Sequence, residues 1–109
     1  MEIKEITDKF SISPQITIAD MAEIKKTGFR AIICNRPGGE GADQSSFGEI
    51  EKAAKKAGLV AAYLPAEAGI VIDDNVAEFG VVLKVLQRSL LGYCKSGMRS
   101  ARLWSLHEA

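Results

Sequence analysis

A cysteine and an arginine near the end of the chain have the types and the spacing needed to attack and hold an anion. The segment reads Cys94-Lys95-Ser96-Gly97-Met98-Arg99. A cysteine thiolate is a strong nucleophile, and a guanidinium is a permanent cation whose planar fork matches a tetrahedral oxyanion. The N–H groups of a tight loop and the positive end of a following helix stabilise an anion in the same place. We therefore predict an anion-binding loop in which Cys94 is ionised at neutral pH.

Each residue of this loop has an expected part. Gly97 permits a backbone conformation that a side chain would obstruct, and Ser100 is placed to donate a hydrogen bond to the Cys94 sulfur. The predicted catalytic residues are Cys94 and Arg99, and the predicted anion-binding residues are Lys95, Ser96, Gly97, Met98, Arg99 and Ser100. The competing interpretation is a buried structural cysteine followed by a glycine turn. The apolar strand before the loop and the helix after it favour the functional interpretation.

Three residues outside the loop are candidates for accessory roles: Arg36, Glu67 and Asp73. Arg36 would add positive charge, although a solvated turn arginine explains it equally well. Glu67 or Asp73 would supply the general acid that cleavage of a phosphate ester needs, although a solvated loop residue and a helix cap are the simpler explanations. Cys34 is interpreted as a buried core cysteine. With one histidine and two separated cysteines, we expect neither a metal site nor a cofactor.

Strands and helices alternate along the chain. Apolar runs bounded by glycine or proline predict strands over residues 29–34, 59–64 and 90–94, and a short edge strand over 10–12. Helices are expected to begin at Thr17, at the capping box of Ser46 and Glu49, at residues 73–75 and near Arg99. The pattern predicts a three-layer α/β fold, a mostly parallel sheet of about four strands flanked by helices. Such sheets bind ligands at the carboxyl ends of their strands, where Cys94 stands.

The length and net charge of the chain limit the classes of protein to which it can belong. The chain has 109 residues and is expected to form one domain over residues 1–109. A formal net charge of zero argues against a nucleic-acid partner, and no apolar run is long enough to cross a membrane. The beginning of the chain has no secretory signal, so a cytoplasmic location is expected. The apolar helix faces are compatible with a homodimer.

Two blocks of the sequence carry a family resemblance. The first contains Ser13-Pro14-Gln15, Thr17, Asp20, Gly28-Phe29-Arg30 and the run from Ile33 to Glu40, and the second runs from Tyr93 to Ser100 with Trp104. Together they resemble the beta-lactamase-hydrolase-like phosphatase-like domain family. The resemblance implies a fold like that of dual-specificity cysteine phosphatases. Family members are described as phosphatases or sulfur transferases, and some are fused to persulfide dioxygenases, so a persulfide dioxygenase is an expected partner.

Three functions remain open from the sequence. In the loop, Arg99 follows Cys94 by five positions, as in rhodanese-type sulfurtransferases, whereas cysteine phosphatases use six and usually place histidine where this chain has Tyr93. The leading hypothesis is therefore sulfur transfer from thiosulfate or a persulfide through a Cys94 persulfide. The second is phosphomonoester hydrolysis through a phosphocysteine. The third is a non-catalytic module that binds an anion or carries a persulfide. In each case the ligand is a small anion.

Overall fold

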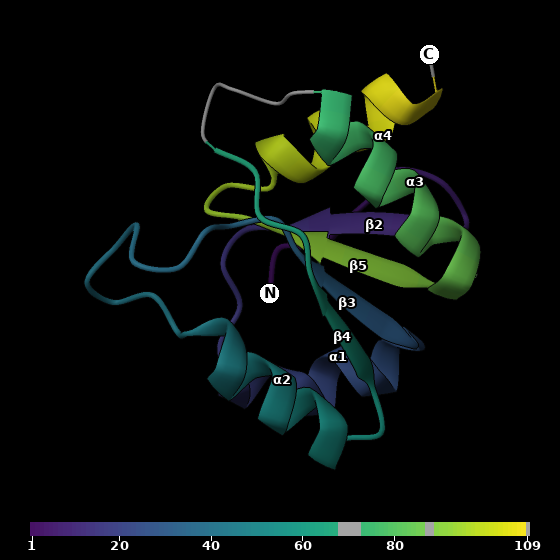
Figure 1. Cartoon of the computed structure of the whole chain (residues 1–109). Coiled ribbons are helices and arrows are strands. Elements are labelled where there is room, and N and C mark those ends of the chain that lie inside the picture. The colour runs from purple at the N-terminus through teal and green to yellow at the C-terminus, as the bar shows by residue number, and fades with distance from the viewer. Residues whose placement is uncertain (68–72, 87–88, 109) are drawn as a thin grey trace.

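The computed structural model describes residues 1–67, 73–86 and 89–108, and these contain a five-stranded sheet in the order β1-β2-β5-β3-β4 (Figure 1). The strands are β1 (Lys4–Glu5), β2 (Phe10–Ser13), β3 (Ala31–Cys34), β4 (Val60–Tyr63) and β5 (Leu90–Tyr93). β2, β5, β3 and β4 run parallel, and β1 pairs antiparallel with β2. β5 therefore occupies the middle of the sheet, with a parallel partner on each side.

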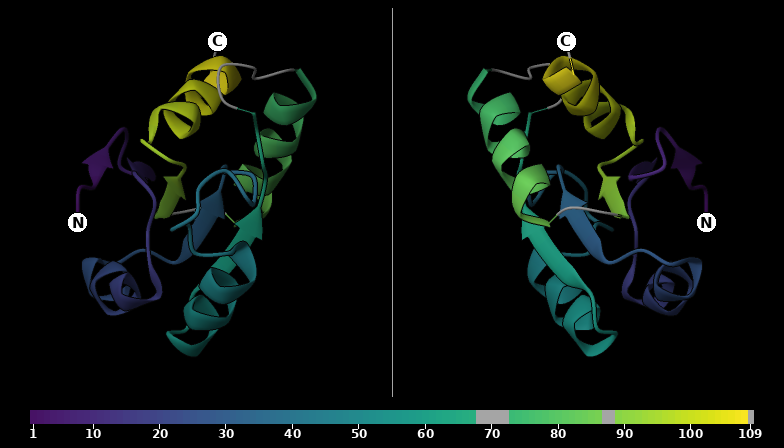
Figure 2. Two further views of the ribbon diagram at one scale, coloured as in Figure 1. Left: turned by 90° about the vertical axis from the view of Figure 1, so that its left-hand side faces the viewer. Right: turned by 90° about the vertical axis from the view of Figure 1, so that its right-hand side faces the viewer.

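Helices cover both faces of this sheet (Figures 1 and 2). They are the 3₁₀ turn η1 (Ile18–Asp20) and the helices α1 (Met21–Thr27), α2 (Phe47–Lys56), α3 (Asp73–Leu86) and α4 (Met98–Glu108). α1 and α2 lie on one face, and α3 and α4 lie on the other. The three-layer, mostly parallel α/β fold expected from the sequence is confirmed.

Local signals fix most of the helix ends. The Ser46 hydroxyl accepts a hydrogen bond from the Glu49 N–H at 3.2 Å, and the Glu49 carboxylate accepts one from the Ser46 N–H at 3.2 Å, so the predicted capping box begins α2. Gly28 ends α1 with a left-handed φ of 107°. Thr17 caps the turn η1 ahead of α1. The described part of α3 begins at Asp73, within the predicted start at residues 73–75, and Asp73 and Asp74 lie in its first turn.

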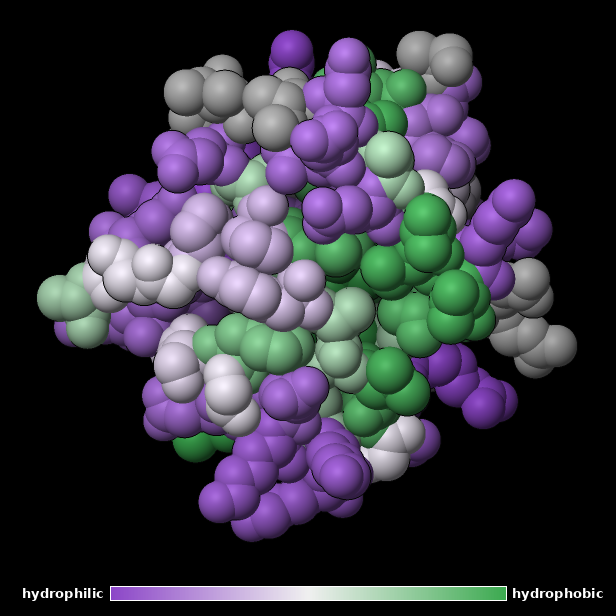
Figure 3. Space-filling view, in the orientation of Figure 1, coloured by the Kyte–Doolittle hydropathy of each residue, from purple (hydrophilic) through white to green (hydrophobic). Residues whose placement is uncertain are grey.

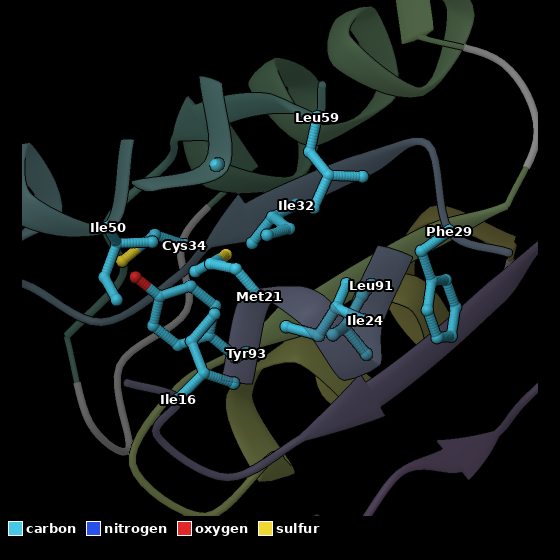
Figure 4. Close-up of a cluster of buried hydrophobic side chains, with 11 residues drawn as sticks. Ile16, Met21, Ile24, Phe29, Ile32, Cys34, Ile50, Leu59, Leu91 and Tyr93 are labelled. Carbon is cyan, nitrogen blue, oxygen red and sulfur yellow. The ribbon is translucent and has the colours of Figure 1, made fainter. Parts of the chain in front are cut away.

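The alternation of side chains along β3 and β5 divides the core into two parts. Ile32, Cys34, Leu91 and Tyr93 pack with α1 and α2, through Met21, Ile24, Ile50 and Ala54 among others (Figure 4). Ala31, Ile33 and Leu90 pack on the opposite face with Phe79 of α3 and Leu103 of α4. Because apolar side chains leave β3 and β5 on both faces, these strands read as continuous apolar runs in the sequence.

An apolar surface remains over β4 and α3 (Figure 3). Among the exposed large apolar side chains, Val60 belongs to β4, and Val81 and Val85 belong to α3. A homodimer through such a surface stays a prediction. None of the helices in the described part of the chain has the length and apolar character needed to span a membrane.

The close approach of helix and sheet at Gly92 yields a prediction about stability. A Cβ atom on Gly92 would lie 2.9 Å from Phe10 Cζ and 3.3 Å from Ser100 Cβ. We expect Gly92→Ala to lower the free energy of unfolding by about 1–3 kcal/mol, because the core would have to shift to admit the methyl group. Urea denaturation measures this change.

Gly48→Ala is the matched control, because Gly48 lies on exposed helix surface where the nearest atom to an added Cβ is Ser46 Oγ at 3.9 Å. Alanine favours helix by up to about 1 kcal/mol over glycine, so this variant should be equal to the wild type or more stable. Equal stability of Gly92→Ala and the wild type would contradict the close packing described.

Candidate active site

Cys94 lies at the carboxyl end of the central strand β5. The parallel register places Ser13 and Cys34, the last residues of β2 and β3, on either side of Tyr93, so Cys94 begins the loop just above the middle of the sheet. Its side chain is buried, and its sulfur accepts a hydrogen bond from the Gly97 N–H at 3.0 Å. A backbone N–H aimed at the sulfur stabilises negative charge on it. That the loop binds an oxyanion stays a prediction.

The turn depends on Gly97. Its φ is +93°, a left-handed conformation that strongly favours glycine, and an added Cβ would lie 3.4 Å from the Ser13 carbonyl oxygen. α4 begins at the next residue, Met98, and the Ala101 N–H donates to the Gly97 carbonyl at 3.0 Å. The other predicted loop residues, Lys95, Ser96 and Met98, are exposed at the mouth.

Arg99 is buried, and the Glu40 carboxylate and the Ala66 carbonyl together fix the orientation of its guanidinium. Its Nη1 donates to Glu40 Oε2 at 2.7 Å and to the Ala66 carbonyl at 2.9 Å, and its Nη2 donates to Glu40 Oε1 at 2.8 Å. These hydrogen bonds to Glu40 are the largest cause of a raised Arg99 pKa, and the neighbouring Cys94 raises it further. Arg99 is therefore a fixed cation beside the Cys94 sulfur.

Glu40 joins a second buried arginine to the site. Arg36 Nε donates to Glu40 Oε1 at 3.1 Å, and Arg36 Nη1 donates to Gln15 Oε1 at 3.0 Å. The hydrogen bonds from Arg99 are the largest cause of the lowered pKa of Glu40. Burial opposes them, and the hydrogen bond from Arg36 lowers the pKa further. Arg36 is 6% exposed, so the interpretation as a solvated turn arginine is wrong. Sequence reasoning assigned no role to Glu40, the residue that connects these cations.

Ser100 has a different partner from the one expected. Its hydroxyl donates to Asn35 Oδ1 at 2.8 Å, and Asn35 Nδ2 donates to the Leu64 carbonyl at 2.9 Å. A hydroxyl has one proton to donate, so in this arrangement Ser100 does not donate to the Cys94 sulfur. Both side chains are fully buried, and the pair ties the start of α4 to the segments that follow β3 and β4.

Cys34 lies in the core behind the site. Its thiol donates to the Arg36 carbonyl at 3.3 Å, and burial is the main cause of its raised pKa. The Tyr93 hydroxyl points toward Cys34 (Figure 4), and burial is likewise the main cause of the raised pKa of Tyr93. A neutral, buried thiol fits the structural role predicted for Cys34.

The two candidate acids are exposed. In the described ranges 1–67, 73–86 and 89–108, no hydrogen bond or ion pair joins Glu67 or Asp73 to the loop after Cys94. Glu67 does follow Ala66, whose carbonyl binds Arg99, so its backbone lies at the rim of the site. A cavity of about 960 Å³ lies elsewhere, between α3 and α4 near Trp104 and His107. None of its lining residues belongs to the Cys94 loop.

Comparison with known proteins identifies relatives of the whole described fold. The family model described as Beta-lactamase hydrolase-like protein, phosphatase-like domain, matches residues 2–109. A curated relative from Xylella fastidiosa, named Beta-lactamase hydrolase-like protein, is 30% identical over 108 residues, which are 99% of this chain and 25% of that protein. One of the same name from Agrobacterium fabrum is 28% identical over 109 residues, 100% of this chain and 25% of that protein. The chain thus spans about a quarter of the length of these relatives.

Solved structures share the fold. A Neisseria meningitidis protein provisionally described as a phosphatase is 31% identical, with a TM-score of 0.91 over 99% of this chain and 77% of that chain. A kinase associated phosphatase, crystallised with its catalytic-site cysteine replaced by serine, is 17% identical, with a TM-score of 0.72 over 90% of this chain and 63% of that chain. The latter likeness concerns the fold alone. The expected resemblance to cysteine phosphatases is confirmed.

The lowered pKa of Glu40 predicts how stability depends on pH. The folded pKa lies below the unfolded value of 4.5, so the ionised carboxylate stabilises the fold above about pH 4.5, and this contribution is lost as the pH falls below it. We expect Glu40→Gln to be less stable than the wild type at about pH 7, and the difference in free energy of unfolding to shrink steadily toward about pH 3. Urea denaturation across this range measures the difference.

Glu51→Gln removes an exposed carboxylate from α2 and serves as the control, since its effect should stay small at every pH. A stability difference for Glu40→Gln that is as large at low pH as at neutral pH would count against the charged pairing of Glu40.

Proposed function

Because this chain belongs to the family of Beta-lactamase hydrolase-like protein phosphatase-like domains, we propose that it is a cysteine-dependent enzyme acting on a small oxyanion, and that its reaction is sulfur transfer through Cys94. The fold is of the phosphatase type. The nucleophile is the cysteine at the carboxyl end of β5, and the oxyanion is held by the loop N–H groups and Arg99.

Sulfur transfer from thiosulfate needs only the groups present in the loop. The Cys94 thiolate attacks the outer sulfur of thiosulfate and forms a new S–S bond. The bond between that sulfur and the sulfonate sulfur breaks, and sulfite leaves with the electron pair. The product is a Cys94 persulfide. An acceptor thiolate then attacks its outer sulfur, takes it away as a persulfide, and returns the Cys94 thiolate.

The observation that carries this proposal is the state of Glu40. This carboxylate reaches the loop, but two arginines hold it ionised and lower its pKa. An ionised, doubly paired carboxylate is a poor proton donor. Sulfite is stable as an anion and leaves without a proton, whereas the alkoxide of a phosphate ester needs one. The short spacing between Cys94 and Arg99 supports the same choice.

Phosphomonoester hydrolysis is the second candidate, and the family and the phosphatases of similar fold favour it. The Ala66 carbonyl binds Arg99, so the segment that contains Glu67 borders the site. In this reaction Cys94 attacks phosphorus, the P–O bond breaks, and Glu67 protonates the leaving alcohol. Water then hydrolyses the phosphocysteine. The third candidate, a persulfide carrier for a partner such as a persulfide dioxygenase, shares the first half of the sulfur-transfer reaction.

Intact mass after incubation with thiosulfate tests sulfur transfer. We expect the reduced wild type to gain one sulfur atom and Cys94→Ser to gain none. Cys34→Ser is the matched control and should still gain the sulfur, because Cys34 lies in the core. Catalytic amounts of protein should then convert cyanide to thiocyanate over many turnovers. Release of one thiocyanate per protein molecule, with no further turnover, would indicate a persulfide carrier instead.

An aryl phosphate as substrate tests the second candidate. If the chain hydrolyses phosphomonoesters, Glu67→Gln should lower kcat by about 100-fold or more through loss of the general acid, with KM changed little. Hydrolysis by the wild type together with an unchanged mass in thiosulfate would reject sulfur transfer and establish the phosphatase activity.

A further inference from the structure

We propose that Glu40 is the positioning residue of this site, which fixes the Arg99 guanidinium so that one edge of it faces an oxyanion bound beside Cys94. This inference rests on the proposed function insofar as the site binds a small oxyanion, but it applies equally to a sulfur or a phosphorus substrate. Glu40 acts through Arg99 and does not itself touch the substrate.

The contacts of Arg99 divide its donors into two groups. A guanidinium has five N–H donors in a fixed plane. Three hydrogen bonds in the described structure use both donors of Nη1 and one donor of Nη2, toward Glu40 and Ala66. The donors left are the second N–H of Nη2 and the N–H of Nε, which lie parallel along one edge. That edge is the bidentate geometry that binds a carboxylate, phosphate or similar oxyanion.

In this proposal the free edge lies on the side of the Cys94 sulfur. Arg99 follows Cys94 across the turn at Gly97, whose N–H donates to that sulfur, and Cys94 is among the groups that raise the pKa of Arg99. With Glu40 and Ala66 occupying the rest of the guanidinium, an anion can engage Arg99 only along this edge. The side chain is 8% exposed, so it has little room to adopt another orientation.

Glu40 is itself held in place. Arg36 Nε donates to its Oε1 at 3.1 Å, and Gln15 accepts from Arg36 at 3.0 Å. The loop that carries Glu40 is braced by the Gln44 side chain, which donates to the Pro37 carbonyl at 2.9 Å, and by the Tyr63 hydroxyl, which accepts from the Gly38 N–H at 3.0 Å. A carboxylate so restrained supplies a rigid reference for the guanidinium, as a preorganised site requires.

The negative charge of Glu40 opposes anion binding, whereas its positioning of Arg99 favours it. The two roles can therefore be distinguished by experiment. A carboxylate beside the site repels both the thiolate and an oxyanion. If charge alone mattered, its removal would strengthen anion binding and favour the thiolate. The positioning role predicts that binding weakens, because a free guanidinium loses its orientation. The two effects have opposite signs, so one variant can distinguish them.

The test compares Glu40→Gln, Glu40→Asp and the control Glu51→Gln. Iodoacetamide labels Cys94, the label is quantified on the Cys94 peptide by mass spectrometry, and sulfate is the oxyanion that protects. We expect labelling of Glu40→Gln without sulfate to be as fast as in the wild type or faster, while about tenfold more sulfate is needed for protection. With an active substrate, kcat should fall by about 10- to 100-fold. Glu40→Asp should recover part of both losses.

Each alternative result overturns the proposal. Protection of Glu40→Gln at the sulfate concentration of the wild type would show that Arg99 needs no positioning. A wild type that sulfate does not protect would show that the free edge binds no oxyanion. If Glu40→Gln slowed labelling without sulfate by the same factor by which it weakened protection by sulfate, the variant would have disturbed the Cys94 loop itself. Labelling does not require turnover, so a failure of the proposed sulfur transfer would be recognised separately.

Discussion

The site depends on keeping a guanidinium charged, buried and aimed. Removing a charge from water is costly unless other groups replace the lost hydration, and Arg99 receives that replacement from the Glu40 carboxylate and the Ala66 carbonyl. These two acceptors follow β3 and β4, the strands that neighbour β5 on one side. The order of the sheet therefore matters for the site, because adjacent parallel strands bring Cys94, the Glu40 carboxylate and the Ala66 carbonyl to the same end of the sheet.

The same edge supplies the tight packing that shapes the loop. Ser13 at the end of β2 lies against Gly97, and the Asn35–Ser100 hydrogen bond ties α4 to the opposite side. The thiol of Cys94 is thus enclosed by strands on both sides of β5 and by the first turn of α4. Such enclosure limits solvent around the sulfur.

Much of this architecture follows from the sequence, because its signals are local. Apolar runs located β3, β4 and β5, the Ser46 capping box located α2, and the position of Cys94 after a strand located the site. β1 was not predicted, since two exposed charged residues, Lys4 and Glu5, carry no strand pattern. Glu40 was missed because 59 residues separate it from Arg99, and a carboxylate after two glycines reads as a solvated turn. Ser100 was assigned to the sulfur because its actual partner, Asn35, lies 65 residues away in the sequence.

The distance along the chain between Glu40 and Arg99 also bears on how the protein matures. Contacts between remote segments require long loops to close, and they tend to form late in folding. Until they form, the Arg99 guanidinium lacks the Glu40 carboxylate that orients it in the native state. A partly folded chain therefore carries the Cys94 loop without a guanidinium of fixed orientation. The orientation of Arg99 thus belongs to the completed tertiary structure and not to the loop alone.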